Sequence, residues 1–177
     1  WDFGQTGRRG IEFDLVTAEV WELDPSLHAV YDITDVEVSS PTGAPATFTQ
    51  TDRTDGDGRR HTSLRIGDPE RALDTSRETY VISYAMAGGL RTFDGVPELH
   101  LDVTSDDYPA IERFSVTIDA AAGDVPRARC LAGPRECGAD VAGGAAMLTG
   151  TDVASGETIT AVAELPAGQR GAEPRLQ

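Results

Sequence analysis

Apolar and polar side chains alternate through residues 78–103, and this period of two is typical of β-strands rather than helices. The first run of the segment places its bulkier side chains on one face: Tyr80, Ile82, Tyr84 and Met86. A second run follows a glycine-punctuated loop and places three aliphatic side chains on one face: Leu99, Leu101 and Val103. The segment therefore predicts two strands of a sheet.

Similar strand signals recur along the chain with turn residues between them. The further candidate strands cover residues 28–39, 46–51, 61–66, 111–118, 146–151 and 157–165, and residues 11–21 are interpreted as extended. In residues 28–39 the apolar phase slips between Ile33 and Val36, which predicts a β-bulge near Thr34 and Asp35. Residues 70–76 leave room for a single helical turn at most. Residues 130–137 read as a loop, and a Gly/Ala stretch follows at residues 138–145.

This pattern of roughly nine or ten short strands, without a helical period, is typical of an all-β fold. We expect an antiparallel β-sandwich, immunoglobulin/fibronectin-like, with little or no helix. A barrel remains open, because periodicity cannot separate the two. The length of 177 residues favours one domain over residues 1–168, followed by a polar linker at 169–177 that leads toward a membrane segment.

The net charge of −15 repels phosphate backbones, so we expect no nucleic-acid partner. No apolar run approaches the ~20 residues that a membrane-spanning helix needs. The first residues, WDFGQTGRRG, contain neither an initiator Met nor an apolar stretch. We therefore expect that any signal peptide has been removed.

The chain has two cysteines, Cys130 and Cys137, with the sequence LAGPRE between them. A short loop with glycine and proline can bring two thiols to bonding distance, and a disulfide is the favoured interpretation. Two free buried thiols remain the alternative, while two cysteines without a nearby histidine do not make a tetrahedral metal site. A disulfide would indicate an oxidising, extracytoplasmic compartment.

Catalytic and metal-binding motifs are missing from the sequence, which has no HExxH, GxSxG, phosphate loop or CxxC. His28, His61 and His100 are scattered singly, which favours ordinary structural roles. The pair Asp106 and Asp107 could in principle serve a glycosidase, although adjacent acidic residues are expected by chance in so acidic a chain. We therefore expect no enzyme and no cofactor.

An acidic cluster in residues 51–61, TDRTDGDGRRH, raises the question of calcium binding. If Asp55, Asp57 and Gly58 occupy positions three, five and six of an EF-hand loop, the two anchoring carboxylates are replaced by Arg53 and Leu64. The stretch is therefore interpreted as a mobile hairpin tip rather than a metal site.

The loop from Gly88 to Pro97 is the best candidate for a recognition surface, because it carries Arg91, Phe93 and Asp94 among polar residues. The alternative is that Phe93 only covers an open end of the core. The sequence leaves three functions open. The chain is a non-catalytic interaction or structural module that binds an envelope protein, a cell-wall glycan-binding module, or an enzyme without any identifiable residue set. Glycan binding would need exposed aromatic side chains, for which Trp21 and Tyr108 are the further candidates.

Several short motifs, in order, resemble those of a family of exported bacterial membrane proteins, domain of unknown function family 2207. They are Phe3-Gly4 with Arg8-Arg9-Gly10-Ile11, Tyr31-Asp32-Ile33 with Val36, Ile66-Gly67-Asp68-Pro69, Tyr80-Val81-Ile82-Ser83-Tyr84, Phe93-Asp94-Gly95 with Glu98-Leu99, Ile111-Glu112-Arg113, Arg129-Cys130 with Ala132-Gly133-Pro134, and Leu165-Pro166-Ala167-Gly168.

The resemblance implies an extracytoplasmic β-sandwich, preceded by a signal peptide and a first strand and followed by transmembrane helices, with no established activity. The chain departs from the family pattern at two places. His100, Leu101 and Asp102 replace a Tyr-Trp pair with Asn, and Glu12-Phe13-Asp14-Leu15 replaces a strand that ends in Pro. Since the family's first strand precedes Trp1, we expect an exposed sheet edge through which two copies could pair.

Overall fold

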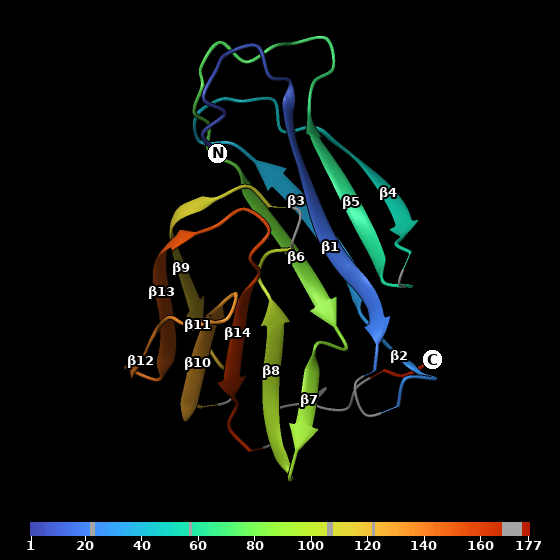
Figure 1. Cartoon of the computed structure of the whole chain (residues 1–177), viewed down its shortest axis with the longest axis vertical. Coiled ribbons are helices and arrows are strands. Elements are labelled where there is room, and N and C mark those ends of the chain that lie inside the picture. The colour runs from blue at the N-terminus through green and yellow to red at the C-terminus, as the bar shows by residue number, and fades with distance from the viewer. Residues whose placement is uncertain (22–23, 57, 106–107, 122, 168–174) are drawn as a thin grey trace. The chain divides into compact units, whose positions relative to one another are not determined.

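The chain folds entirely into antiparallel β-sheets in the computed structural model, which describes all residues except 22–23, 57, 106–107, 122 and 168–174 (Figure 1). The described residues form fourteen strands and no helix, so the all-β prediction is confirmed. Contacts divide the chain into two compact units, Trp1–Ala87 with Arg175–Gln177, and Gly88–Pro174. The single domain over residues 1–168 stays a prediction.

The first unit contains two sheets. The larger sheet has the order β2-β1-β5-β4, and the smaller pairs β3 with β6. The strands of this unit are β1 (Gly10–Val20), β2 (His28–Val30), β3 (Asp32–Ser39), β4 (Phe48–Thr54), β5 (Arg60–Gly67) and β6 (Val81–Ala87).

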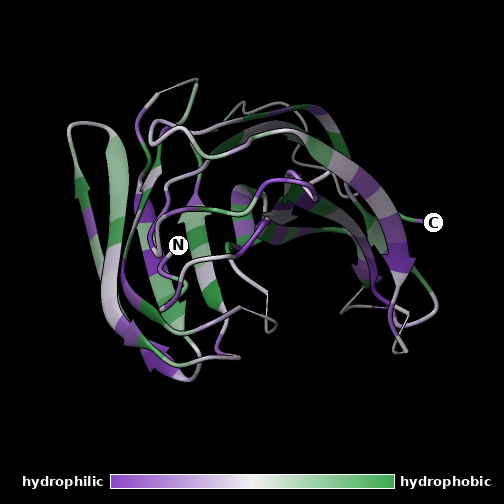
Figure 2. Ribbon diagram, turned by 90° about the horizontal axis from the view of Figure 1, so that it is seen from above, coloured by the Kyte–Doolittle hydropathy of each residue, from purple (hydrophilic) through white to green (hydrophobic). Residues whose placement is uncertain are grey.

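The core of the first unit lies between these two sheets. Ile11, Leu15, Leu64 and Ile66 are buried on the larger sheet. The smaller sheet packs apolar side chains of β3 and β6 against them: Ile33, Val36, Val38, Ile82 and Tyr84. Figure 2 shows the corresponding change between hydrophobic and hydrophilic residues along single strands. The predicted alternation of residues 80–86 is therefore what places β6 on this core.

The predicted bulge in β3 is present. The register of β3 against β6 shifts between Thr34 and Glu37, and Asp35 has a φ of 53°. The extra residue returns Val36 and Val38 to the face of Ile33, which lets all three pack on the core.

A glycine pair closes one end of the β1–β5 ladder. Gly10 and Gly67 are register partners, and both have a φ of 138°. A Cβ atom on Gly10 would lie 1.9 Å from the carbonyl oxygen of Ile66. Only glycine fits two backbones that approach this closely.

The second unit also contains two sheets, with strand orders β11-β10-β14-β8-β7 and β12-β13-β9. Its strands are β7 (Leu90–Phe93), β8 (Val96–Asp102), β9 (Ile111–Ile118), β10 (Arg127–Ala132), β11 (Arg135–Glu136), β12 (Gly138–Ala142), β13 (Ala145–Val153) and β14 (Ile159–Glu164). Ile118 and Leu148 of the smaller sheet share a core with Cys130, Ala161 and Ala163 of the larger. The predicted boundaries of β9 are confirmed at both ends.

Two segments predicted as loops are strands instead. The stretch from Gly88 to Pro97 contains β7 and the start of β8, joined by a tight turn at Asp94 and Gly95 with φ values of 49° and 81°. These values suit the two-residue hairpin turn that Asp-Gly sequences favour. Residues 130–137 contain the second half of β10 together with β11, and the Gly/Ala stretch that follows contains β12, so the chain is richer in strand than the sequence predicts.

Candidate functional site

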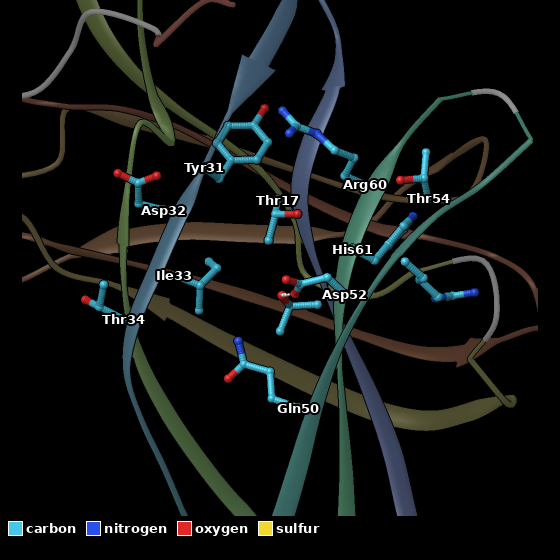
Figure 3. Close-up of a pocket in the computed structure, with 12 residues that line it drawn as sticks. Thr17, Tyr31, Asp32, Ile33, Thr34, Gln50, Asp52, Thr54, Arg60 and His61 are labelled. Atoms are coloured by element: carbon cyan, nitrogen blue, oxygen red, sulfur yellow. Dashed lines mark hydrogen bonds between the residues drawn. The ribbon is translucent and has the colours of Figure 1, made fainter.

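The first unit contains an open, mostly polar pocket of about 590 Å³. Twelve residues line it: Thr17, Tyr31, Asp32, Ile33, Thr34, Gln50, Asp52, Arg53, Thr54, Arg60, His61 and Thr62. In Figure 3, residues 31–34 follow one another along one wall, and Gln50, Asp52 and Arg60 project from the strands opposite. The volume falls within the range of ~300–1,000 Å³ that is usual for small-ligand sites.

The floor of the pocket continues the face of the sheet that carries the core. At every second position of β4, Phe48 packs on the core, whereas Gln50, Asp52 and Thr54 line the pocket. On the neighbouring strand, the series from Ile66 back to Arg60 changes from apolar to polar in the same way. A face that would be expected to continue the apolar core therefore presents polar groups at one end.

Residues 31–34, which form one wall of the pocket, lie where β3 begins. Tyr31 is 8% exposed, and its hydroxyl donates a hydrogen bond to Oε1 of Glu19. Asp32 forms an ion pair with Arg175. Ile33 also packs against the core of the unit, so the wall is anchored where β3 begins.

Two of the residues that line the pocket, Arg53 and His61, belong to a charged network around Asp55. Nε2 of His61 lies 2.7 Å from Oδ2 of Asp55, and Nη1 of Arg53 lies 3.6 Å from Oδ1 of the same carboxylate. The other Nη of Arg53 donates a 2.6 Å hydrogen bond to Asp14. These contacts hold the β4–β5 hairpin together, and they give Asp55 a structural role in place of the calcium role considered from the sequence. Asp57, the second residue of that calcium hypothesis, lies outside the described residues.

Four side chains on the floor have hydrogen-bonding capacity left over: Gln50, Asp52, Thr54 and Arg60. Asp52 accepts a hydrogen bond from the hydroxyl of Thr62 at Oδ1, and its Oδ2 has no partner among the described residues. In the part of the chain that the structure describes, the side chains of Gln50, Thr54 and Arg60 form no hydrogen bond or ion pair. The floor therefore offers an acceptor, a cation, an amide and a hydroxyl to solvent or to a ligand.

The recognition residues predicted from the sequence lie on the β7–β8 hairpin of the second unit. Arg91 is only 6% exposed, whereas Phe93 is 39% exposed and its register partner Val96 is 40% exposed. Asp94 occupies the turn between them and is exposed. The hairpin tip therefore presents an apolar pair to solvent while Arg91 belongs to the interior.

The histidines are not brought together. His61 is buried beside Asp55, His28 lies in β2, and His100 pairs with Val162 in the second unit. Among the described residues, no three side chains of His, Cys, Asp or Glu form a group able to hold a metal ion. Asp106 and Asp107, the carboxylate pair considered from the sequence, lie outside the described residues.

Trp21 and Tyr108, the aromatic side chains considered for sugar stacking, are buried or half-buried among residues of the fold. Trp21 is 8% exposed and packs with Ala29 and Tyr31. Tyr108 is half-buried and its backbone carbonyl accepts hydrogen bonds from Gly156 and Ser155. Neither Trp21 nor its neighbour Tyr31 offers an open ring face for a sugar to stack on.

Several carboxyl groups have pKa values below their ordinary values. Hydroxyl donors from Thr42 and then Thr75 lower the pKa of Glu78, a residue that is 6% exposed. The backbone amide of Ala154, followed by Arg135, lowers the pKa of Glu157. Both carboxylates are held ionised by donors that fix loops, which is opposite to the raised pKa that a general acid needs.

The disulfide predicted from the sequence is present. Cys130 in β10 and Cys137 are joined with a Cα–Cα distance of 5.1 Å, and the amide of Cys137 donates a 3.0 Å hydrogen bond to the carbonyl of Cys130. Cys130 is 2% exposed and packs in the core of the second unit. The bond therefore ties the β10–β11 hairpin to that core.

Comparison with family models shows a match to the N-terminal domain of a predicted membrane protein, DUF2207, over residues 1–170. No curated protein and no solved structure matches the chain. The described residues contain no helix with the length and apolar character needed to cross a bilayer.

Proposed function

Because the chain belongs to the DUF2207 family of predicted membrane proteins, whose N-terminal domain it matches over residues 1–170, we propose that it is the extracytoplasmic domain of a membrane-anchored protein. Its role is to bind an envelope partner without catalysing a reaction. The observation that carries the proposal is the disulfide between Cys130 and Cys137.

The disulfide supports an oxidising compartment because cytosolic thiols are kept reduced by glutathione and thioredoxin. The two sulfurs join adjacent parts of a β-hairpin, and Cys130 packs against the unit's core. The pair has no neighbouring metal-ligand group of the kind that cytosolic cysteines often serve, among the residues described. A structural crosslink is the role that these surroundings favour.

The ionisation and hydrogen bonding of the polar side chains support a binding role. The carboxylates of Glu78 and Glu157 are held ionised by hydrogen-bond donors, and His61 is buried against Asp55. Catalysis by acid and base requires two groups with separated pKa values near one reacting atom. Open surfaces with free hydrogen-bonding or apolar groups, as on the β4–β5 floor and the β7–β8 tip, suit binding instead.

The redox state of the two cysteines in cells tests the location. Cells that express the full-length protein are quenched in acid, and free thiols are alkylated with a maleimide that adds mass before any reduction. We expect no mass shift until a reductant is added first. An unreduced sample in which both cysteines are alkylated would place the domain in a reducing compartment.

The tip of the β7–β8 hairpin is the proposed contact for an envelope protein. Phe93 is 39% exposed beside the exposed Val96, and a protein interface favours such an aromatic anchor. Arg91 is buried, so we assign it to supporting the hairpin rather than to direct contact. Asp94 shapes the turn that presents Phe93.

A crosslinking experiment with the full-length protein tests this contact. We expect Phe93→Ala to reduce the yield of a specific crosslinked envelope protein while the melting temperature stays nearly unchanged. Val141→Ala, which truncates another 39% exposed side chain, is the matched control and should leave the yield intact. Equal loss in both variants, or unfolding by Phe93→Ala, would assign the tip to the scaffold.

A further inference from the structure

The polar floor of the first-unit pocket has an unusual balance of hydrogen-bonding groups. Asp52 is an acceptor with Oδ2 unengaged, and Arg60 is a donor with no ion-pair partner among the described residues. Gln50 and Thr54 both donate and accept, and neither forms a side-chain hydrogen bond in the described part of the chain. Asp52 carries one negative charge and Arg60 one positive charge, so the four side chains together have no net charge.

The other charged residues of the pocket are already satisfied. Asp32 pairs with Arg175, and Arg53 pairs with Asp14 and Asp55. His61 lies against Asp55 and is 3% exposed. The groups that remain for a ligand are therefore those of Gln50, Asp52, Thr54 and Arg60.

We propose that this pocket binds a neutral, polyhydroxylated ligand of the carbohydrate class. Each sugar hydroxyl can donate to the carboxylate of Asp52 and accept from the guanidinium of Arg60, so neighbouring hydroxyls satisfy both residues without adding charge. The amide of Gln50 and the hydroxyl of Thr54 complement further hydroxyls in the same way. The inference goes beyond the protein contact proposed for the β7–β8 tip, because it assigns a ligand of another class to a separate pocket.

Other ligand classes fit the pocket less well. An anion would meet Arg60 but also Asp52, in a chain with a net charge of −15. A cation would be repelled by Arg60, which has no ion-pair partner in the described part of the chain. An apolar ligand would leave Gln50, Asp52 and Arg60 desolvated without partners, which costs more than its contact with Ile33 returns. The volume of about 590 Å³ is sufficient for a short segment of an oligosaccharide.

This mode of recognition does not need the aromatic platforms that the sequence suggested. Trp21 is buried, and the hydroxyl of Tyr31 is engaged by Glu19. Affinity would come from hydrogen bonds made by side chains on regular strands, which hold their positions better than loops do. The ligand would lie along β4, because Gln50, Asp52 and Thr54 follow one another on one face of that strand.

Nuclear magnetic resonance titration tests the inference with the isotopically labelled chain. The probes are neutral tetrasaccharides of glucose, mannose, galactose and N-acetylglucosamine, added one at a time. We expect at least one probe to shift the amide signals of residues 50–54 and 60–62 in a saturable way. We expect Asp52→Asn to weaken that binding about tenfold and Gln50→Ala to weaken it several-fold, since each removes hydrogen bonds to the ligand.

Two threonines of the same strand provide matched controls. Thr49 and Thr51 are exposed, alternate with the floor residues and do not line the pocket, so Thr49→Ala and Thr51→Ala should bind as the unmodified chain does. The inference is overturned if no probe gives saturable shifts, or if the shifts are confined to other residues. It is also overturned if the control variants lose as much binding affinity as Asp52→Asn and Gln50→Ala. These results leave the redox and crosslinking tests unaffected, so failure of the carbohydrate site is distinguishable from failure of the proposed function.

Discussion

Gln50, Asp52 and Thr54 show why the pocket could not be found from the sequence. Their strand reads FTQTDRT, in which Thr49, Thr51 and Arg53 between them are equally polar. Alternation identifies the inner face of a strand only when one set of positions is apolar. The pattern of residues 51–61 therefore predicts a mobile tip, whereas β4 extends to Thr54 and β5 starts at Arg60.

Gly10 is a position where we expect one added methyl group to destabilise the fold strongly. Gly10→Ala places a methyl group 1.9 Å from the carbonyl oxygen of Ile66 at a φ of 138°, so β1 and β5 must separate. We expect a loss of about 2 kcal/mol or more in the free energy of unfolding, measured by urea denaturation. Gly56→Ala is the control, since a Cβ there meets nothing within 4 Å. Similar midpoints for the two variants would contradict the proposed close approach.

Glu78 gives the first unit a dependence on pH. Hydroxyl donors from Thr42 and Thr75 lower its pKa below the ordinary value of 4.5. A lowered folded-state pKa stabilises the fold above the unfolded-state pKa, and this contribution disappears as the pH falls through the folded-state value. Acidification should therefore remove the stabilisation that Glu78 provides.

Thermal unfolding from about pH 7 to about pH 3 measures this contribution. We expect Glu78→Gln to melt below the unmodified chain near neutral pH, and the gap to narrow as the solution is acidified. Glu70→Gln, in an exposed turn, serves as the control and should melt with the unmodified chain throughout. A gap that is constant with pH would show that the carboxylate charge plays no part.

Among the elements, the β10–β11 hairpin was predicted only through its crosslink. Cys130 and Cys137 indicated a disulfide, but the residues between them were assigned to loop. Leu131 pairs with Glu136 and Ala132 with Arg135, around a turn in which Gly133 has a φ of 55°. Two residue pairs are too few to produce a periodic signal, so the strand could not be recognised from its sequence.

The disulfide of this hairpin should stabilise the second unit measurably. Closing a ring of this size contributes about 2.5 kcal/mol in the loop-entropy model. We expect the denaturation midpoint to fall when the reductant is added, and the Cys130→Ala, Cys137→Ala double variant to match the reduced chain. A double variant that still responds to reductant, or an unmodified chain that does not respond, would contradict this assignment.

The β7–β8 hairpin was missed for a different reason. Glycines on both sides of residues 90–93 favour a loop. The Asp94-Gly95 pair, which is typical of a two-residue hairpin turn, is the signal that indicates the hairpin. Leu90 pairs with Leu99 and Phe93 with Val96, so a four-residue strand completes the edge of the sheet. Such a short strand is stabilised by its neighbour β8 rather than by its own sequence.

For the whole chain, the sequence predicted the class of fold and the family, and both are confirmed. Strong local alternation of apolar and polar residues, as in residues 111–118, was sufficient to predict individual strands. The order of strands was not predictable, because β14 pairs with β8 and β10, which lie far from it in the sequence. The division into two compact units has no counterpart in the sequence, because no Pro- or Ser-rich linker marks the point near Gly88.

The location of the domain relative to the membrane decides the proposed role, because it determines which partners and sugars the domain can meet. Thr51 is exposed in the middle of β4, and the native cysteines are paired, so Thr51→Cys gives the full-length protein one reactive thiol in the described residues. Intact cells are treated with a membrane-impermeant maleimide and compared with lysed cells. We predict equal labelling in both; labelling that requires lysis would contradict an extracytoplasmic binding domain.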